Sequence, residues 1–152
     1  MNTIRDMTPE DLPAVVAMES ANQPTPWSEN VFREEIAADN RTYFVVGEPV
    51  VAFGGVMVIG EEAHVTNLLV APASRRQGLG RALLVALVEA AVRLGAKHLT
   101  LEVRAGNTGA RALYASVGMA PVGMRRDYYG DDDAIIMWAH DIDAESFLWS
   151  LT

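Results

Sequence analysis

One short segment combines three arginines with two glycines, in the order Arg75-Arg76-Gln77-Gly78-Leu79-Gly80-Arg81. It lies between an apolar run that predicts a strand and an amphipathic run that predicts a long helix. Glycines let a backbone approach a bulky phosphate, and the free N–H groups and dipole of a helix N-terminus favour negative charge. The segment therefore predicts an anion site, although a capped surface turn would use the same residue types.

Two nucleotide-binding motifs compete for this segment. A dinucleotide fingerprint would also place Gly78 and Gly80 at a helix start, with an acidic residue such as Glu102 about twenty residues later. Its third small position is Leu83, however, and an arginine-rich loop stands where that motif has a tight turn. No Gly-Lys-Ser/Thr sequence is present, which excludes the phosphate loop of nucleotide hydrolases.

Two further side chains, Glu102 and Tyr114, have the chemistry for proton transfer. Glu102 alternates with Leu101 and Val103 along an expected strand, which directs its carboxylate away from the apolar face. Tyr114 shares a helical face with Val117. An ion pair with an arginine is the alternative role for Glu102, and a buried core position is the alternative for Tyr114.

Periodicity and turn residues predict the elements that must position these groups. Strands are expected over 42–46, 50–59, 63–70, 98–103, 122–126 and 134–139, and helices over 9–21, from Ser28 onward, over 79–94 and over 107–117. Gly54-Gly55 suggests a bulge. This order, with one short strand first, predicts an α/β (α+β) mixed sheet of six or seven strands with four helices on both faces.

Composition limits the classes of protein. The chain of 152 residues fits a single domain, 1–152, and it has no cysteine, which excludes disulfides and a thiol nucleophile. His64, His98 and His140 lack metal-site spacing, so we expect no metal. No apolar run is long enough to cross a membrane, and no signal peptide is recognisable, so we expect the protein in the cytoplasm. The net charge of −8 disfavours nucleic acid and favours cationic peptides, although solubility alone would also explain it.

The pattern Arg75-x-x-Gly78-x-Gly80 resembles the pyrophosphate motif of the GNAT acetyltransferases, whose fold has a similar order of elements. Further segments resemble the RimI-type ribosomal-protein alanine N-acetyltransferases and extend from Trp27 to Met137. They are Pro26-Trp27-Ser28-Glu29, Asn67-Leu68-Leu69-Val70, Arg76 to Leu84, Leu101-Glu102-Val103-Arg104, Asn107, Leu113-Tyr114, Arg125-Arg126-x-Tyr128-Tyr129 and Asp133-Ala134-Ile135-Ile136-Met137.

The resemblance implies an acetyl-CoA-dependent enzyme that acetylates the N-terminal α-amine of a protein, with the N-terminal alanine of a small-subunit ribosomal protein as substrate. Glu102 would accept the proton of the amine, directly or through water, and Tyr114 would protonate the departing thiolate. The cofactor site would comprise the acetyl-aligning backbone of Leu68, Leu69 and Val70, the pyrophosphate group Arg75, Arg76, Gln77, Gly78, Leu79, Gly80 and Arg81, and Asn107 beside the pantetheine.

Substrate recognition stays more open. Trp27 is either a loop anchor or a wall of a peptide groove, and Tyr128 and Tyr129 lie beside three aspartates that form either a rim for basic peptides or a solvated loop. The apolar segment 147–151 is expected to dock on its own domain. Two other functions remain: a GNAT enzyme that acetylates lysine or a small amine, and a non-catalytic coenzyme A-binding module, which would need neither Glu102 nor Tyr114.

Overall fold

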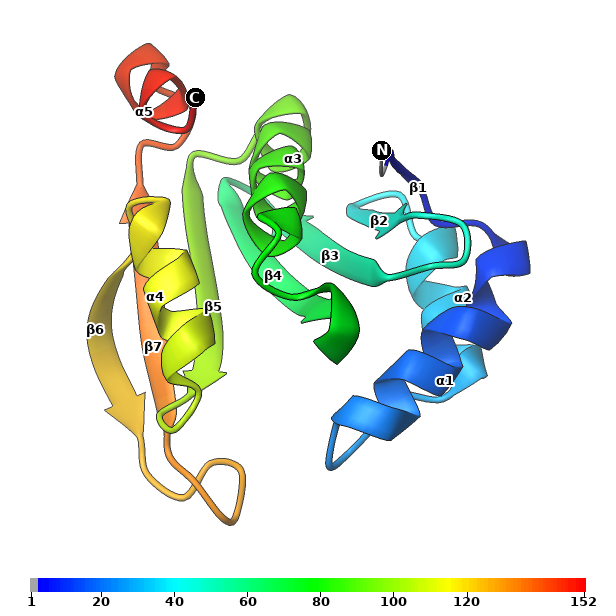
Figure 1. The fold of residues 1–152 in the computed structure, drawn as a ribbon. Coiled ribbons are helices and arrows are strands. Elements are labelled where there is room, and N and C mark those ends of the chain that lie inside the picture. Colours follow the sequence, from blue (N-terminus) through cyan, green and yellow to red (C-terminus); the bar gives the residue numbers. More distant parts are fainter. Residues whose placement is uncertain (1–2) are drawn as a thin grey trace.

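The computed structural model describes residues 3–152 and contains a seven-stranded sheet in the order β1-β2-β3-β4-β5-β7-β6 (Figure 1). The strands are β1 (Ile4–Asp6), β2 (Arg41–Val46), β3 (Ala52–Ile59), β4 (Glu62–Val70), β5 (His98–Arg104), β6 (Ala120–Arg125) and β7 (Ala134–His140). Among the described residues, β4 and β5 are the one parallel pair, and all other neighbours are antiparallel. The expected mixed sheet is confirmed.

Within the described part of the chain, five α-helices accompany the sheet: α1 (Leu12–Asn22), α2 (Glu29–Ala37), α3 (Leu79–Arg93), α4 (Thr108–Ser116) and α5 (Glu145–Ser150). Ser28 caps α2 as expected, because its hydroxyl accepts the N–H of Val31. The helix expected from residue 9 begins instead with a separate 3-10 turn, Pro9–Asp11, where the Thr8 hydroxyl donates to the Asp11 carboxylate at 3.2 Å. No helix within residues 3–152 has the length and apolarity to cross a bilayer.

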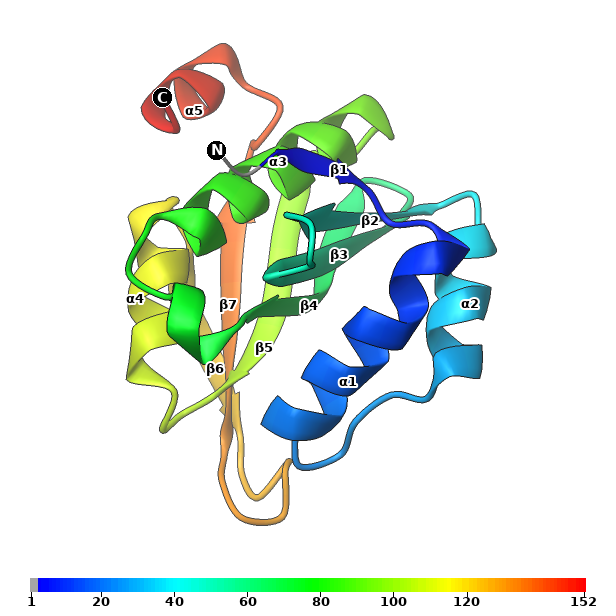
Figure 2. The ribbon, with the colours of Figure 1, turned by 45° about the vertical axis from the view of Figure 1, so that its right-hand side comes forward.

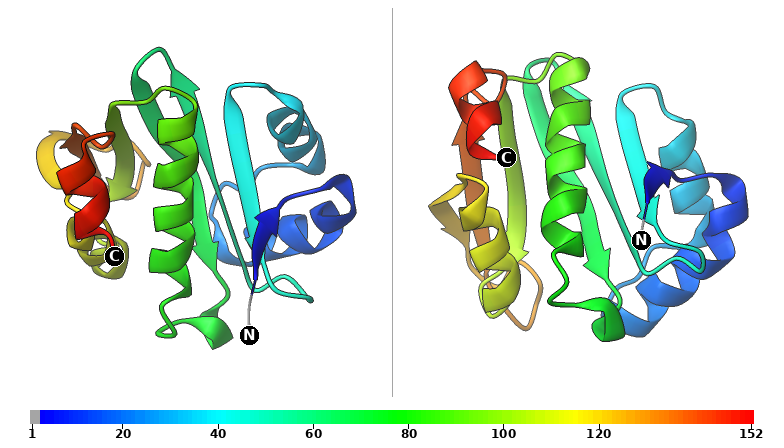
Figure 3. Two further views of the ribbon diagram at one scale, coloured as in Figure 1. Left: turned by 90° about the horizontal axis from the view of Figure 1, so that it is seen from above. Right: turned by 45° about the horizontal axis from the view of Figure 1, so that its top comes forward.

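The helices lie on the two faces of the sheet, as Figure 3 shows for α3 on one side of β2–β4 and for α1 and α2 on the other. Each face has its own core. Leu83, Leu84 and Leu87 of α3 pack with residues of β3, β5 and β7, whereas Phe32 of α2 packs with Phe53 of β3 and residues of α1. We call these the α3-side core and the α1–α2 core.

A β-bulge interrupts the β3–β4 ladder. Gly55 pairs with Asn67 and Val56 pairs with Val65, so Thr66 is an extra residue on β4. The irregularity expected at Gly54-Gly55 is thus present, with its extra residue on the partner strand. Gly55 is required here, because a Cβ would lie 2.1 Å from the ring of Tyr43.

The ring of Tyr43 carries a polar network that fixes the bulge. Its hydroxyl lies 2.8 Å from the Thr66 hydroxyl and donates to the Glu35 carboxylate at 2.7 Å. The other oxygen of Glu35 lies 2.8 Å from Nε of Arg41. Because Tyr43 is 4% exposed, its hydroxyl needs the partners Glu35 and Thr66, and these contacts tie α2 and β2 to the middle of β4.

The C-terminal segment docks on the α3-side core. Leu151 is buried, and Phe147 and Leu148 pack against the same core, which confirms the expected docking. Trp149 does not take part, because it is 70% exposed. The short helix α5 was not expected from the sequence.

Candidate active site

The parallel strands β4 and β5 separate in the middle of the sheet. Their ladder contains three pairs and ends at His64 and Thr100, yet β4 continues to Val70 and β5 continues to Arg104 (Figures 1 and 2). Among residues 3–152, the backbone of Leu68, Leu69 and Val70 therefore has no partner strand on its β5 side. We call this opening the β4–β5 wedge, and it leaves backbone N–H and C=O groups free to bind a ligand.

The arginine-glycine segment lies between the end of β4 and the start of α3. The helix begins at Leu79, and its N-cap Gly78 has φ +79°, with no side-chain cap and open space where a Cβ would stand. The first N–H groups of α3 are therefore available to an anion. Arg76 and Gln77 are exposed beside them.

Gly80 joins three parts of the candidate site. A Cβ at this position would lie 3.3 Å from Leu113 of α4 and 3.6 Å from Val70 of β4. The absence of a side chain lets the start of α3 approach both the end of β4 and the helix α4, which carries Tyr114. The predicted pyrophosphate segment, the wedge and Tyr114 are thus neighbours in the fold.

Two of the arginines are engaged by backbone carbonyls. Nε of Arg75 donates to the carbonyl of Val70 at 3.1 Å, which fixes the loop to the end of β4. Nη1 of Arg81 donates to the carbonyl of Leu151 at 3.1 Å. Arg76 has no hydrogen bond or ion pair within residues 3–152 and a φ of +65°, so it is the arginine most available to an incoming phosphate.

Glu102 projects from β5 beside the wedge. Leu101 and Val103 point into the α3-side core, so Glu102 points to the opposite face, as expected. Its carboxylate lies 3.5 Å from Nη2 of Arg125. The expected alternative, an ion pair, is therefore present, but it is long and the Arg125 side chain is 55% exposed, so the contact leaves the carboxylate accessible to another partner.

Tyr114 lies in the α3-side core and is 7% exposed. Burial, together with nearby Tyr129, raises the pKa of Tyr114 to about 12. Its hydroxyl makes no hydrogen bond within residues 3–152 and is not among the fully enclosed polar atoms of that range. The ring is therefore a core group, whereas the hydroxyl keeps its proton at neutral pH and remains available.

Tyr129 lies near both proton-transfer candidates. Burial, and then the negative charge of Glu102, raise the pKa of Tyr129. The guanidinium of Arg104 lies 4.3 Å from the centre of the Tyr129 ring and donates to Asp131 at 2.6 Å. Tyr128 packs edge-on against Tyr129 and is 51% exposed. The structure thus places the two tyrosines and one of the aspartates on one rim beside Glu102.

Trp27 anchors the loop between α1 and α2. Its ring packs against Phe32, with 5.3 Å between the ring centres, and joins the edge of the α1–α2 core. The structure therefore gives Trp27 the anchoring role, and its side chain stays partly exposed, so the alternative of a peptide-groove wall stays a prediction.

Glu19 is a buried carboxylate that the sequence interpretation missed. It is 3% exposed, and its Oε2 accepts the N–H of Trp27 at 3.0 Å. Burial raises the pKa of Glu19. The spacing Leu12, Val15 and Glu19 places it on the buried stripe of α1, and this spacing was the signal that could have identified it.

Asn107 caps α4. Its side-chain oxygen accepts the N–H of Ala110 at 3.1 Å, so the amide nitrogen is the group left for the pantetheine contact that the sequence predicts. Within residues 3–152, no three His, Asp or Glu side chains lie together as metal ligands would.

The residues fit an acyl thioester of coenzyme A. The unpaired backbone of the wedge suits the amides of a pantetheine arm, and the uncapped start of α3 with Arg76 suits a pyrophosphate. Leu68, Leu69 and Val70 would hold the acyl end, and the segment 75–81 would hold the phosphates.

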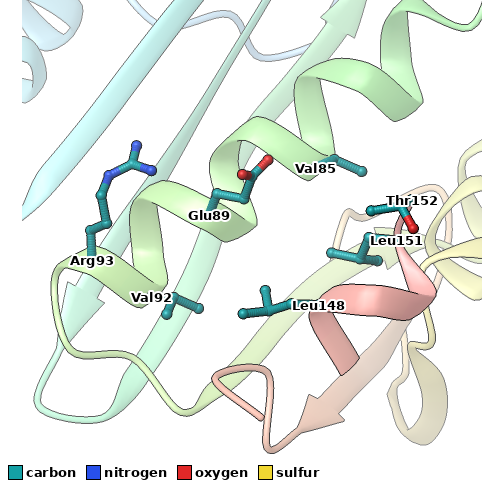
Figure 4. A pocket seen from close by; sticks show the side chains of 7 residues that line it. All are labelled: Val85, Glu89, Val92, Arg93, Leu148, Leu151 and Thr152. Carbon is teal, nitrogen blue, oxygen red and sulfur yellow. The ribbon is translucent and has the colours of Figure 1, made fainter. Parts of the chain in front are cut away.

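A separate groove lies between α3 and the C-terminal residues Leu148, Leu151 and Thr152 (Figure 4). Val85 and Val92 make one wall apolar, with Glu89 and Arg93 at the helix surface (Figure 4). None of the predicted site residues lines it. The groove is the seam along which the C-terminal segment docks on α3.

These features are those of an acetyltransferase, and the chain belongs to the GNAT acetyltransferase family, since the family model described as "Acetyltransferase (GNAT) family" matches residues 10–119. This family uses acetyl-CoA as the acetyl donor. The expected fold, family and cosubstrate are confirmed.

The chain is similar to proteins named [Ribosomal protein bS18]-alanine N-acetyltransferase. It is 39% identical to the one from Escherichia coli (strain K12) over 142 residues, which covers 90% of this chain and 96% of that protein. It is 38% identical to the one from Salmonella typhimurium (strain LT2) over 150 residues, with 90% and 96% covered.

Solved structures show the same similarity. The crystal structure of the ribosomal-protein-S18-alanine N-acetyltransferase from Escherichia coli superposes with a TM-score of 0.83 at 39% identity, covering 93% of this chain and 94% of that chain. Arabidopsis thaliana NAA60 in complex with acetyl-CoA superposes with a TM-score of 0.86 at 16% identity, covering 95% and 100%, and this likeness concerns the fold alone.

Proposed function

We propose that the chain acetylates the N-terminal α-amine of a protein, and that its substrate is the N-terminal alanine of ribosomal protein bS18. The observation that carries this proposal is the 39% identity to the Escherichia coli enzyme over 90% of the chain. The wedge supports it, because a carboxylate and a protonated phenol lie on either side of the place where an acyl group would be held.

The residues of the chain divide the proton transfers between them. Acetyl-CoA, when bound, supplies the thioester carbonyl that an amine attacks. Glu102 accepts a proton from the incoming amine, directly or through a water molecule, and Tyr114 donates its proton to the departing sulfur. The high pKa of Tyr114 keeps that proton in place at neutral pH. No cysteine is present to form an acyl-enzyme, which favours direct attack by the amine while acetyl-CoA is bound.

An α-amine is a better substrate than lysine for this arrangement. Its pKa is lower by about 2.5 units, so neutralising it requires about 3.4 kcal/mol less. The net charge of −8 and the aspartates near Tyr129 favour a basic substrate. Trp27, Tyr128 and Tyr129 form the peptide-contacting surface in this proposal.

The test is a comparison of three peptides incubated with the protein and acetyl-CoA. The first carries the N-terminal sequence of bS18, the second has the same sequence with a blocked terminus and one internal lysine, and the third begins with a residue other than alanine. Mass spectrometry identifies the acetylated nitrogen. We expect acetylation of the first peptide at its α-amine, whereas modification of the lysine alone would refute the proposal, and turnover of none would favour a binding module.

A further inference from the structure

The segment between β6 and β7, residues 126–133, carries two adjacent tyrosines and three consecutive aspartates, and we call it the β6–β7 loop. It is closed by hydrogen bonds of its own. The N–H of Asp127 donates to the Asp133 carboxylate at 2.8 Å. The N–H of Tyr129 donates to the Asp132 carbonyl at 3.1 Å. The loop therefore forms a hydrogen-bonded turn with a defined conformation.

A second set of contacts fixes this loop to the end of β5. The Asp132 carboxylate accepts the N–H of Gly106 at 2.9 Å. The carbonyl of Asp133 accepts the N–H of Ala105 at 2.9 Å. A Cβ on Gly106 would lie only 3.1 Å from the Asp132 carboxylate, so the glycine favours this close approach. The β6–β7 loop is thus attached to the two residues that follow Arg104.

Arg104, the last residue of β5, holds the loop through its side chain. Nη1 donates to Oδ1 of Asp131 at 2.6 Å, and the guanidinium carbon lies 4.3 Å from the centre of the Tyr129 ring. A planar guanidinium can pair with a carboxylate and stack on an aromatic ring at the same time. The Arg104 side chain is 25% exposed, so it is a packed side chain and not a free surface cation.

The tyrosine that Arg104 contacts lies near both proton-transfer candidates. Burial is the main cause that raises the pKa of Tyr129, and the charge of Glu102 is the next. Burial is also the main cause that raises the pKa of Tyr114, and Tyr129 is the next. Glu102 and Arg104 are two positions apart on β5, so their side chains leave the same face of the sheet. Arg104 therefore determines where the Tyr129 ring lies relative to the Glu102 carboxylate.

The three aspartates of the loop already accept hydrogen bonds from this chain. Asp131 accepts from Arg104, Asp132 from Gly106 and Asp133 from Asp127. The side chains that the sequence offers as a rim for basic peptides thus order the loop itself, whatever charge they also present to a substrate.

We propose that Arg104 is a positioning residue, which holds the β6–β7 loop and the Tyr129 ring in the place where the N-terminus of a peptide substrate meets them. This inference rests on the proposed function, because it requires a peptide as acceptor. A loop that is already ordered loses little conformational freedom on binding, so the peptide binds more tightly. In the described chain the Arg104 side chain contacts this loop and not the segment 75–81, so the affinity for acetyl-CoA should not depend on it.

The first experiment compares Arg104→Gln with Lys97→Gln. Lys97 directly precedes β5 and forms an exposed ion pair with Glu61 at 3.1 Å, so the control removes one charge and one ion pair at the other end of the same strand. We expect Arg104→Gln to raise the KM for the bS18 peptide about three- to tenfold and to leave the KM for acetyl-CoA unchanged. Lys97→Gln should change neither. An unchanged peptide KM in Arg104→Gln, or an equal rise in Lys97→Gln, would overturn the proposal.

A double-mutant cycle tests whether Arg104 acts through Tyr129. Tyr129→Leu removes the ring, so Arg104→Gln should raise the peptide KM less in this background than in wild type. Equal factors in the two backgrounds would show that Arg104 does not act through the ring. Asp131→Ala should raise the KM by the same factor for a basic and for a neutral peptide. An effect confined to the basic peptide would instead show direct recognition by Asp131 and would remove its role as the partner of Arg104.

Hydrogen exchange of the free protein needs no substrate and separates this inference from the proposed function. In Arg104→Gln, the N–H groups of Tyr129 and Gly106 should exchange faster than in wild type, while those of β3 stay the same. Unchanged exchange of these groups would overturn the positioning role of Arg104 alone. If they exchange faster but the wild-type protein acetylates no N-terminal peptide, the proposed function fails, and with it the peptide-binding role of the loop.

Discussion

Nη1 of Arg81 donates a hydrogen bond to the backbone carbonyl of Leu151, 3.1 Å away and 70 positions later in the chain. Arg81 lies in the first turn of α3, immediately after the two glycines of the phosphate segment. The contact therefore fastens the last residues of the chain to the helix end that is expected to bind the pyrophosphate.

Replacement of Arg81 by alanine should weaken this attachment. Because Leu151 is buried, we expect the free energy of unfolding to fall by about 1 kcal/mol, measured by urea denaturation. Arg126→Ala is the control, since Arg126 is exposed and makes no hydrogen bond or ion pair in the described part of the chain, and its change should stay within about 0.5 kcal/mol. Equal effects of the two substitutions would remove the stabilising role of Arg81.

Replacement of Glu102 by glutamine should abolish proton acceptance while keeping the size of the side chain. We expect kcat to fall about 10²- to 10⁴-fold and the KM for acetyl-CoA to stay nearly constant. The free energy of unfolding should hardly change, because the 3.5 Å contact with Arg125 is partly exposed. Wild-type turnover in this variant would show that Glu102 is only an ion-pair partner.

Replacement of Tyr114 by phenylalanine removes a hydroxyl that makes no hydrogen bond in the described residues. The fold should therefore persist, as circular dichroism can verify, while steady-state kinetics shows a lower kcat. If the variant kept full activity, another group would have to protonate the sulfur.

Tyr114 also makes stability depend on alkaline pH. Burial raises its pKa from about 10 to about 12, so the folded protein keeps this proton in a pH window where the unfolded chain loses it. The folded state then binds more protons, and the free energy of unfolding falls as pH rises from 10 to 12, by about 3 kcal/mol. Urea denaturation across this window should show a shallower loss for Tyr114→Phe than for wild type.

Arg76 should contribute charge to acetyl-CoA binding. We expect Arg76→Ala to raise the Kd for coenzyme A about tenfold by titration calorimetry, the usual size of one charge-assisted contact. Arg76→Lys should retain most of the affinity. Because φ of Arg76 is +65°, Arg76→Gly should bind as weakly as alanine but unfold at a higher temperature, which separates backbone strain from charge.

The sequence predicted most of the sheet because its strands and helices have regular periodicity and clear ends. Leu79 begins α3 and Ser28 caps α2 as expected, since glycines and capping hydroxyls act locally. The positions of Glu102 and Tyr114 could also be predicted, because strand alternation and helical spacing fix which face each occupies. The wedge itself could not be predicted from periodicity, since it depends on where two strands distant in sequence stop pairing.

Local sequence patterns could not predict the side-chain contacts between segments that are distant in the sequence. The bond between Tyr43 and Thr66 joins residues 23 positions apart and depends on a bulge that shifts the register of β4. Glu19 lies on an apolar stripe, yet only the folded chain shows that the N–H of Trp27 is its partner. The helix α5 was missed because six residues give too little periodicity to recognise.

The two hydrophobic cores lie on opposite faces of the sheet, so the packing on one face can change while the packing on the other face stays the same. Under the proposed function, substitutions that repack Phe32, Trp27 and α1 would alter the surface expected to meet the peptide, while the leucines of α3 and the segment 75–81 would remain as they are. Under the proposed function, related proteins could therefore change their peptide substrate and keep the same site for acetyl-CoA. Selection for a different acceptor would accordingly leave its changes on one side of the sheet.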